Sequence, residues 1–156
     1  MRTLGVIRML GLCGAVAVAS GCATSALLEQ ELTKTNTQTV LAFEETVFNK
    51  HEVQEAFDHY VAPSFVQHDS RLSVDRGQAL AAYAMLVMRR FPQSRLMVER
   101  TIAQGDLVAT QGRWQQSYGH SAPVAVVDIF RLRGGRITEH WNVVQAGSPT
   151  LADLAN

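Results

Sequence analysis

The chain has 156 residues, of which 47% are hydrophobic and 18% are charged, and its 14 basic residues balance its 14 acidic residues. Removal of Arg2 and Arg8 with the N-terminal segment described below leaves 12 basic against 14 acidic residues, a net charge near −2. This balance gives no basic surface for a nucleic acid, and the remaining length is typical of one compact domain.

The first 21 residues predict an export signal. Arg2 and Arg8 form a positive n-region, and the apolar run from 9 to 19 is too short to span a bilayer. The sequence Ala19-Ser20-Gly21-Cys22 resembles the lipobox of bacterial lipoproteins, in which the cysteine is lipidated and becomes the mature N-terminus. Cleavage at an ordinary signal-peptide site after residues 17–19 is the alternative, and both place the protein outside the cytoplasm.

Lipidation of Cys22 would anchor the protein in the cell envelope. By resemblance to lipoprotein sorting, Ala23 rather than Asp after the cysteine implies the outer membrane, facing the periplasm, in a bacterium with two membranes. The only other cysteine, Cys13, lies in the removed segment. The mature domain would therefore have no disulfide, no cysteine nucleophile and no cysteine metal ligand.

Apolar residues at helical spacing predict three helices in the first part of the chain. The first runs from 26 to about 49, and its polar part, 29–39, is expected to be a tether rather than a packed helix. The second runs from 53 to 61 and is interrupted by Pro63; a brief strand follows at 65–68. The third, from 76 to 90, has Asp75 as its N-cap and ends at Phe91-Pro92.

The second part of the chain changes to a strand period. Four strands are expected at 95–103, 107–118, 124–132 and 136–145, and the turn 133–136 makes the last two a hairpin. Helices followed by meandering strands predict an α+β fold, with N-terminal helices packed on a strongly curved antiparallel sheet. A strongly curved sheet covered by helices forms a cone, and the apolar interior of such a cone is suited to a small molecule. We expect a tether at 22–39, the domain at 40–147 and a tail at 148–156.

Asp128 lies inside the most apolar of these strands, between Val127 and Ile129. Burial of an ionised carboxylate costs several kcal/mol unless it is paired, so Asp128 needs a buried partner or a raised pKa. A pocket aspartate acting as a base is one interpretation. The other is an ion pair with Arg113 or His140 that fixes the sheet.

Four segments, 65–69 (FVQHD), Phe91-Pro92, 103–114 (AQGDLVATQGRW) and 126–145 (VVDIFRLRGGRITEHWNVVQ), resemble the SnoaL-like branch of the nuclear-transport-factor-2-like superfamily. The resemblance covers about residues 40–145. It implies a cone-shaped α+β barrel, and the polyketide cyclases of this family catalyse an intramolecular aldol condensation without metal or cofactor, using a pocket aspartate.

The resemblance implies three catalytic residues. Asp128 matches the family's pocket aspartate, His68 matches a recurrent histidine of the first short strand, and His140 matches the histidine of the last strand. Two departures weaken the transfer of activity: the family's final aspartate is Asn142 here, and positions often held by histidine carry Gln111 and Arg113. A turn-stabilising role is the alternative for His68.

Five further side chains are candidates for substrate binding: Tyr83, Arg113, Phe130, Trp141 and Asn142. Alternation along the last strand puts His140 and Asn142 on one face and Trp141 on the other. The aromatic residues also fit a purely packing role, and a strand arginine is most often solvated.

Two functions from different classes follow. The first is an exported enzyme that performs cofactor-independent acid/base chemistry, of the aldol or isomerisation type, on a small carbonyl compound. The second is a non-catalytic lipoprotein domain that binds a hydrophobic molecule or serves as a dimerisation module. No metal-ligand spacing motif is present, so no metal or other cofactor is expected. Proteins with this fold often dimerise through the outer face of the sheet, so the resemblance implies a homodimer for both functions.

Overall fold

The computed structural model describes residues 15–68, 73–116 and 122–145. The expected n-region of the signal, Cys13, the last residues of the strand expected at 107–118 and the tail at 148–156 lie outside these residues. The chain divides into two units, residues 1–31 and residues 32–156, and the second contains the sheet and the site. Within the described part of the chain, no helix has the length and apolar character needed to cross a membrane.

Three helical segments precede the long strands within the described ranges, as predicted. α1 (Ala15–Glu44) continues into a π-helical turn, η1 (Glu45–Asn49); α2 spans Val53–Tyr60; and α3 (Arg76–Ala84) continues into a second π-helical turn, η2 (Met85–Arg90). The N-cap prediction is confirmed: Asp75 Oδ1 accepts from Gln78 N at 2.9 Å, and Asp75 N donates to Gln78 Oε1 at 3.2 Å.

The polar segment at 29–39 is not a tether along its whole length. It is helical, and Asn36 is only 1% exposed, with its amide nitrogen donating to the carbonyl of Gly105 at 3.1 Å. This contact fixes the helix to the turn between two strands. The packed domain therefore begins near Leu32 rather than at Val40.

In the part of the chain that the structure describes, six strands form one mixed sheet in the order β2-β1-β6-β5-β4-β3. Their bounds are Val61–His68 (β1), Ser73–Asp75 (β2), Arg95–Gln104 (β3), Leu107–Gln115 (β4), Val124–Arg133 (β5) and Arg136–Val144 (β6). Strands β3 to β6 pair antiparallel, as predicted, but β1 pairs parallel with β6. The sheet is therefore not wholly antiparallel, and the brief strand expected at 65–68 is longer and lies inside the sheet.

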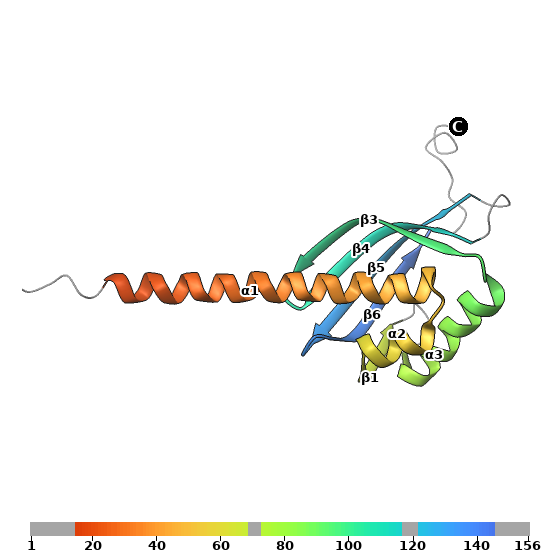
Figure 1. The fold of residues 1–156 in the computed structure, drawn as a ribbon, viewed down its shortest axis with the longest axis horizontal. Coiled ribbons are helices and arrows are strands. Elements are labelled where there is room, and N and C mark those ends of the chain that lie inside the picture. Colours follow the sequence, from red (N-terminus) through yellow and green to blue (C-terminus); the bar gives the residue numbers. More distant parts are fainter. Residues whose placement is uncertain (1–14, 69–72, 117–121, 146–156) are drawn as a thin grey trace, which may run out of the picture. The chain divides into compact units, whose positions relative to one another are not determined.

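One face of the sheet packs against the helices (Figure 1). Aromatic rings fill the centre of this core: Phe43 of α1 lies 5.8 Å from Phe57 of α2 and 5.9 Å from Phe130 of β5, measured between ring centroids. Alternation along β5 buries Val126, Asp128 and Phe130 together. Asp128 is thus placed on the helix-covered face by the same period that buries its apolar neighbours.

The pairing of β3 with β4 is irregular between Val98 and Arg100. A β-bulge of this kind bends a strand and increases the local twist, which accounts for part of the sheet curvature visible in Figure 1. Gly112 of β4 lies opposite this point, and a Cβ atom there would be 2.5 Å from the carbonyl oxygen of Met97. The close approach of the two backbones requires glycine.

Candidate active site

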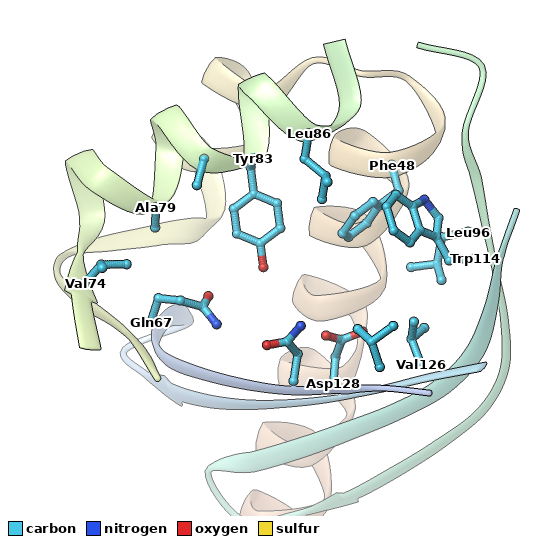
Figure 2. Close-up of a pocket in the computed structure, with 13 residues that line it drawn as sticks. Phe48, Gln67, Val74, Ala79, Tyr83, Leu86, Leu96, Trp114, Val126 and Asp128 are labelled. Atoms are coloured by element: carbon cyan, nitrogen blue, oxygen red, sulfur yellow. The ribbon is translucent and has the colours of Figure 1, made fainter. Parts of the chain in front are cut away.

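A pocket of about 440 Å³ lies between α3, η1 and the helix-covered face of the sheet (Figure 2). Its wall is mostly apolar, with Phe48, Leu86, Leu96, Trp114 and Val126 among the lining residues. Its polar lining consists of Gln67, Tyr83, Asp128 and Asn142. A mostly apolar cavity with a few polar groups is the usual form of a small-molecule site.

Asp128 and His140 form a buried pair at this pocket. The Oδ1 atom of Asp128 is 2.8 Å from Nε2 of His140, and the two residues are 7% and 2% exposed. The sequence left a pocket aspartate and an ion pair with His140 as alternatives, and in the structure Asp128 both lines the cavity and contacts His140. Asp128 lines the cavity and has a partner on its buried side.

The opposite edge of the His140 ring faces two further polar side chains. Nδ1 lies 2.7 Å from Oε1 of Gln67 and 3.0 Å from the hydroxyl oxygen of Tyr83, and the ring stacks on Phe130 with centroids 4.4 Å apart. The Gln67 carbonyl oxygen can only accept, so this contact favours a proton on Nδ1. Partners on both nitrogens fix the imidazole and, through it, the orientation of Asp128.

Tyr83 projects from α3 toward the polar residues of the pocket (Figure 2). Burial, the negative charge of Asp128 and that of Glu44 raise the pKa of Tyr83 well above its ordinary value. Its hydroxyl therefore remains a neutral hydrogen-bond donor over the physiological pH range. Asn142 lies opposite Asp128 in the β5–β6 pairing and lines the same cavity.

A second carboxyl group, which the sequence analysis missed, lies buried on α1 beside this site. Glu44 is 1% exposed, and its Oε1 accepts a hydrogen bond from Thr110 Oγ1 at 2.6 Å. Burial raises the pKa of Glu44 to about 8, the Thr110 hydrogen bond opposes this rise, and the charge of Asp128 adds to it. The available signal was its spacing, because Glu44 stands four residues after Val40 and three before Val47 on the core face of the helix.

His68 is not at the pocket. In the parallel pairing of β1 with β6, Gln67 lies beside His140 and His68 lies beside Trp141. Successive side chains of a strand point to opposite faces, so His68 is on the other side of the sheet from Asp128. There its Nε2 is 2.9 Å from Glu139 Oε2, and its ring stacks on Trp141 at 4.5 Å. The residue that reaches His140 from this strand is Gln67, one position earlier.

Of the five predicted substrate-binding residues, Tyr83 and Asn142 line the pocket. Phe130 is buried beneath the ring of His140 and does not line it. Arg113 is 61% exposed and its Nε is 2.8 Å from Glu99 Oε1, while Trp141 stacks on His68 at the opposite face. The placement of Arg113 and Trp141 at the pocket was wrong because their positions alternate out of phase with Asp128 and His140.

In the described ranges, no group of three or more His, Cys, Asp or Glu side chains is arranged to hold a metal ion. The arrangement of Asp128, His140 and Tyr83 fits proton transfer. It presents a carboxylate acceptor, a fixed imidazole and a hydroxyl donor to one apolar cavity.

Comparison with protein families matches residues 40–140 to the SnoaL-like domain. Among curated proteins, none matches the sequence.

Solved structures share the fold. A proposed SnoaL-like polyketide cyclase from Jannaschia sp. CCS1 has a TM-score of 0.64 and 22% identity, over 72% of this chain and 87% of that one. IdmH, a proposed polyketide cyclase from Streptomyces antibioticus, has a TM-score of 0.61 and 22% identity, over 78% of this chain and 99% of that one. An LEH-like epoxide hydrolase from M. tuberculosis has a TM-score of 0.61 and 17% identity, over 72% and 84% of the two chains. At these identities the similarity shows the fold alone.

Proposed function

Because the chain belongs to the SnoaL-like domain family, we propose that it binds a small carbonyl compound and transfers a proton on it without a cofactor. The observation that supports this proposal is the Asp128–His140 pair at the wall of an apolar cavity. A carboxylate that lines such a cavity is positioned to accept a proton from a bound carbonyl compound.

Each polar residue at the pocket has its own role in the proposed proton transfer. Asp128 takes the proton from the carbon next to the carbonyl group, because its carboxylate lines the cavity. His140 holds that carboxylate in place from the buried side. The Tyr83 hydroxyl and the Asn142 amide face the same cavity and donate to the oxygen on which negative charge develops. The resulting enolate is the common intermediate of aldol condensations and isomerisations.

The lining of the pocket also favours an uncharged substrate. Asp128 is acidic, and none of the described lining residues is a lysine or an arginine. A carboxylate or phosphate on the ligand would meet negative charge with no cation to balance it, which is costly in an apolar cavity. We therefore expect a neutral, largely apolar ketone or ester.

Non-catalytic binding is the second candidate. The pairing of Asp128 with His140 favours it, since a carboxylate with a buried partner also serves to fix the sheet. Both functions predict ligand binding in the cavity, and they differ only in whether the ligand is changed.

An experiment that measures hydrogen exchange at the carbon next to a carbonyl group distinguishes catalysis from binding alone. The protein is mixed in D₂O with a neutral bicyclic ketone such as 2-tetralone, and NMR follows loss of the hydrogens next to the carbonyl. Trp114 lines the pocket, so quenching of its fluorescence reports binding independently. The enzyme proposal expects exchange well above the buffer rate, lost in Asp128→Asn with binding retained. The matched control is Asp106→Asn, since Asp106 is exposed and paired with Arg131. Binding without exchange in the unaltered protein would instead establish a binding domain.

We also propose that the protein is exported and anchored by a lipid at Cys22, facing the periplasm from the outer membrane in a two-membrane bacterium. The lipobox-like sequence from Ala19 to Cys22 supports this proposal. Mass spectrometry of the mature N-terminus tests it. An acylated peptide beginning at Cys22 is expected, and a free N-terminus at residue 20 would show ordinary signal-peptide cleavage.

A homodimer through the outer face of the sheet is a further proposal. Ile102, Ile129 and Val143 are exposed, and the register of β3 to β6 places them on the face opposite the pocket. Analytical ultracentrifugation of the protein and of an Ile129→Lys variant tests it. The variant is expected to sediment as a monomer at concentrations where the unaltered protein is dimeric.

A further inference from the structure

Glu44 is a buried carboxyl group that the proposed chemistry does not use. Its Oε1 accepts from Thr110, whereas its Oε2 is buried and, among the described residues, has no hydrogen-bond partner. An ionised carboxylate has about four acceptor sites to satisfy. With a single donor, the charged form of Glu44 is poorly satisfied in the core, so the geometry itself favours the neutral acid.

Glu44 and Asp128 face the same part of the core. Thr110, which donates to Glu44, is the direct cross-strand partner of Asp128 in the β4–β5 pairing. The negative charge of Asp128 is one of the causes that raise the pKa of Glu44. Two neighbouring buried carboxyl groups resist carrying two negative charges, so ionisation of one disfavours ionisation of the other.

The charged groups around Glu44 indicate whether its carboxyl group holds a proton. The titratable groups on this side of the core are Asp128 from β5, Tyr83 from α3, and His140 from β6. Glu45, the chain neighbour of Glu44, is exposed. Asp128 has the imidazole of His140 at 2.8 Å, whereas no described lysine, arginine or histidine forms an ion pair with Glu44. Glu44, which lacks such a partner, is therefore the carboxyl group that holds a proton.

We propose that Glu44 is a positioning residue that holds a proton beside the Asp128–His140 pair, and that loss of this proton, by adding a second buried negative charge, changes the environment of the pair. This inference rests on the proposed function. While Glu44 is neutral, it adds no charge beside the hydrogen-bonded pair of Asp128 and His140. Once Glu44 ionises, a second negative charge lies in the same part of the core, and the pair experiences it directly.

NMR titration of the full chain tests the proposal without any substrate. With ¹³C-labelled glutamate side chains, one carboxyl resonance is expected to titrate near pH 8, and the ring resonances of His140 should inflect at the same pH. Both signals should disappear in Glu44→Gln, which keeps an acceptor for Thr110 without a titrating proton. Glu45→Gln, the same substitution one residue later at an exposed position, should retain both.

A second variant separates coupling from a local structural change. Thr110→Val removes the hydrogen bond that opposes the rise in the pKa of Glu44, so the carboxyl and His140 inflections should move together to higher pH. Titration of all glutamates near their ordinary values would overturn the proposal, as would a His140 inflection unaffected by Glu44→Gln. Absence of ketone exchange with an intact titration near pH 8 would count against the proposed catalysis and leave the Glu44 proton in place.

Discussion

Gln67 and His140 lie side by side across the only parallel strand pairing of the described sheet, with Gln67 Oε1 2.7 Å from His140 Nδ1. This contact fixes one edge of the imidazole, and Asp128 fixes the other. The ring orientation at the site therefore depends on β1 as well as on the β5–β6 hairpin. Partners of this kind set which nitrogen of a histidine carries a proton.

Removal of the Asp128 carboxylate should destabilise the protein. Asp128→Ala leaves the buried imidazole of His140 without its partner, and breaking a buried pair in this way costs about 3 to 5 kcal/mol. Asp128→Asn should cost less, because its amide oxygen can still accept from His140. Urea denaturation at pH 7 measures the free energies of unfolding. Asp106→Ala breaks an exposed pair with Arg131 and should cost less than about 1 kcal/mol. Equal stability of all variants would contradict a buried pair.

Glu44 makes stability fall as the pH rises. In the unfolded chain a glutamate ionises near 4.5, whereas folded Glu44 keeps its proton until about pH 8. Between these values the folded state binds the extra proton, so the free energy of unfolding decreases with pH, by at most about 5 kcal/mol. This stability is fully present below pH 4.5 and is lost as the pH passes through 8.

Denaturation at several pH values between 4.5 and 9 isolates this effect. Other carboxyl groups, such as that of Glu139 with its lowered pKa, contribute with the opposite sign, so the difference between the unaltered protein and Glu44→Gln is the informative quantity. The variant is expected to gain relative stability steadily from pH 5 to pH 8. A difference that does not change with pH would show that Glu44 is ionised in the folded protein.

The two histidines of the β1–β6 pairing should differ in function. His140→Gln removes the group that orients Asp128 and is expected to abolish ketone hydrogen exchange while the apolar pocket still quenches Trp114 on binding. His68→Gln changes a ring on the opposite face, next to Glu139 and Trp141, and should leave the exchange rate within about twofold. Loss of exchange in both variants would restore the catalytic role that the family resemblance implied for His68.

Two glycines should respond oppositely to alanine. At Gly112 an added Cβ would be 2.5 Å from the Met97 carbonyl oxygen, so the β3 and β4 backbones must move apart, at a cost of about 1 to 3 kcal/mol. At Gly77, near the start of α3, the nearest atom to the added Cβ is Asp75 Oδ1 at 3.5 Å, an ordinary contact. Gly77→Ala should stabilise by about 0.5 to 1 kcal/mol through helix propensity. Thermal denaturation of both variants measures the contrast.

The strand periods and the capping residue of α3 were sufficient to predict most of the fold, because these signals are local. Asp75 and the alternation around Asp128 act over a few residues. The parallel placement of β1 beside β6 could not be read in this way, since it joins segments far apart in the chain. That pairing decides whether Gln67 or His68 reaches the pocket, and nothing near His68 in the sequence indicates that Gln67 takes this place.

The buried carboxyl of Glu44 was missed for a different reason. A glutamate in a helix is usually at the surface, and only its position on the same stripe as Val40 and Val47 pointed inward. Its partner, Thr110, lies 66 residues away, so nothing near Glu44 in the sequence indicates how its charge is handled. Asp128 was easier to find because its immediate neighbours are all apolar.

The parallel pairing of β1 with β6 also has a consequence for the order in which the protein forms. His140 and Gln67 are 73 residues apart, and β6 is the last of the described strands. Contacts of such long range close a large loop and tend to slow folding. During synthesis the helices and β1 emerge well before β6. Until β6 is made, the edge of β1 that pairs with it remains unpaired. The pocket is therefore completed only when the C-terminal hairpin docks, and a chain that stops before β6 would expose apolar surface instead of a binding site.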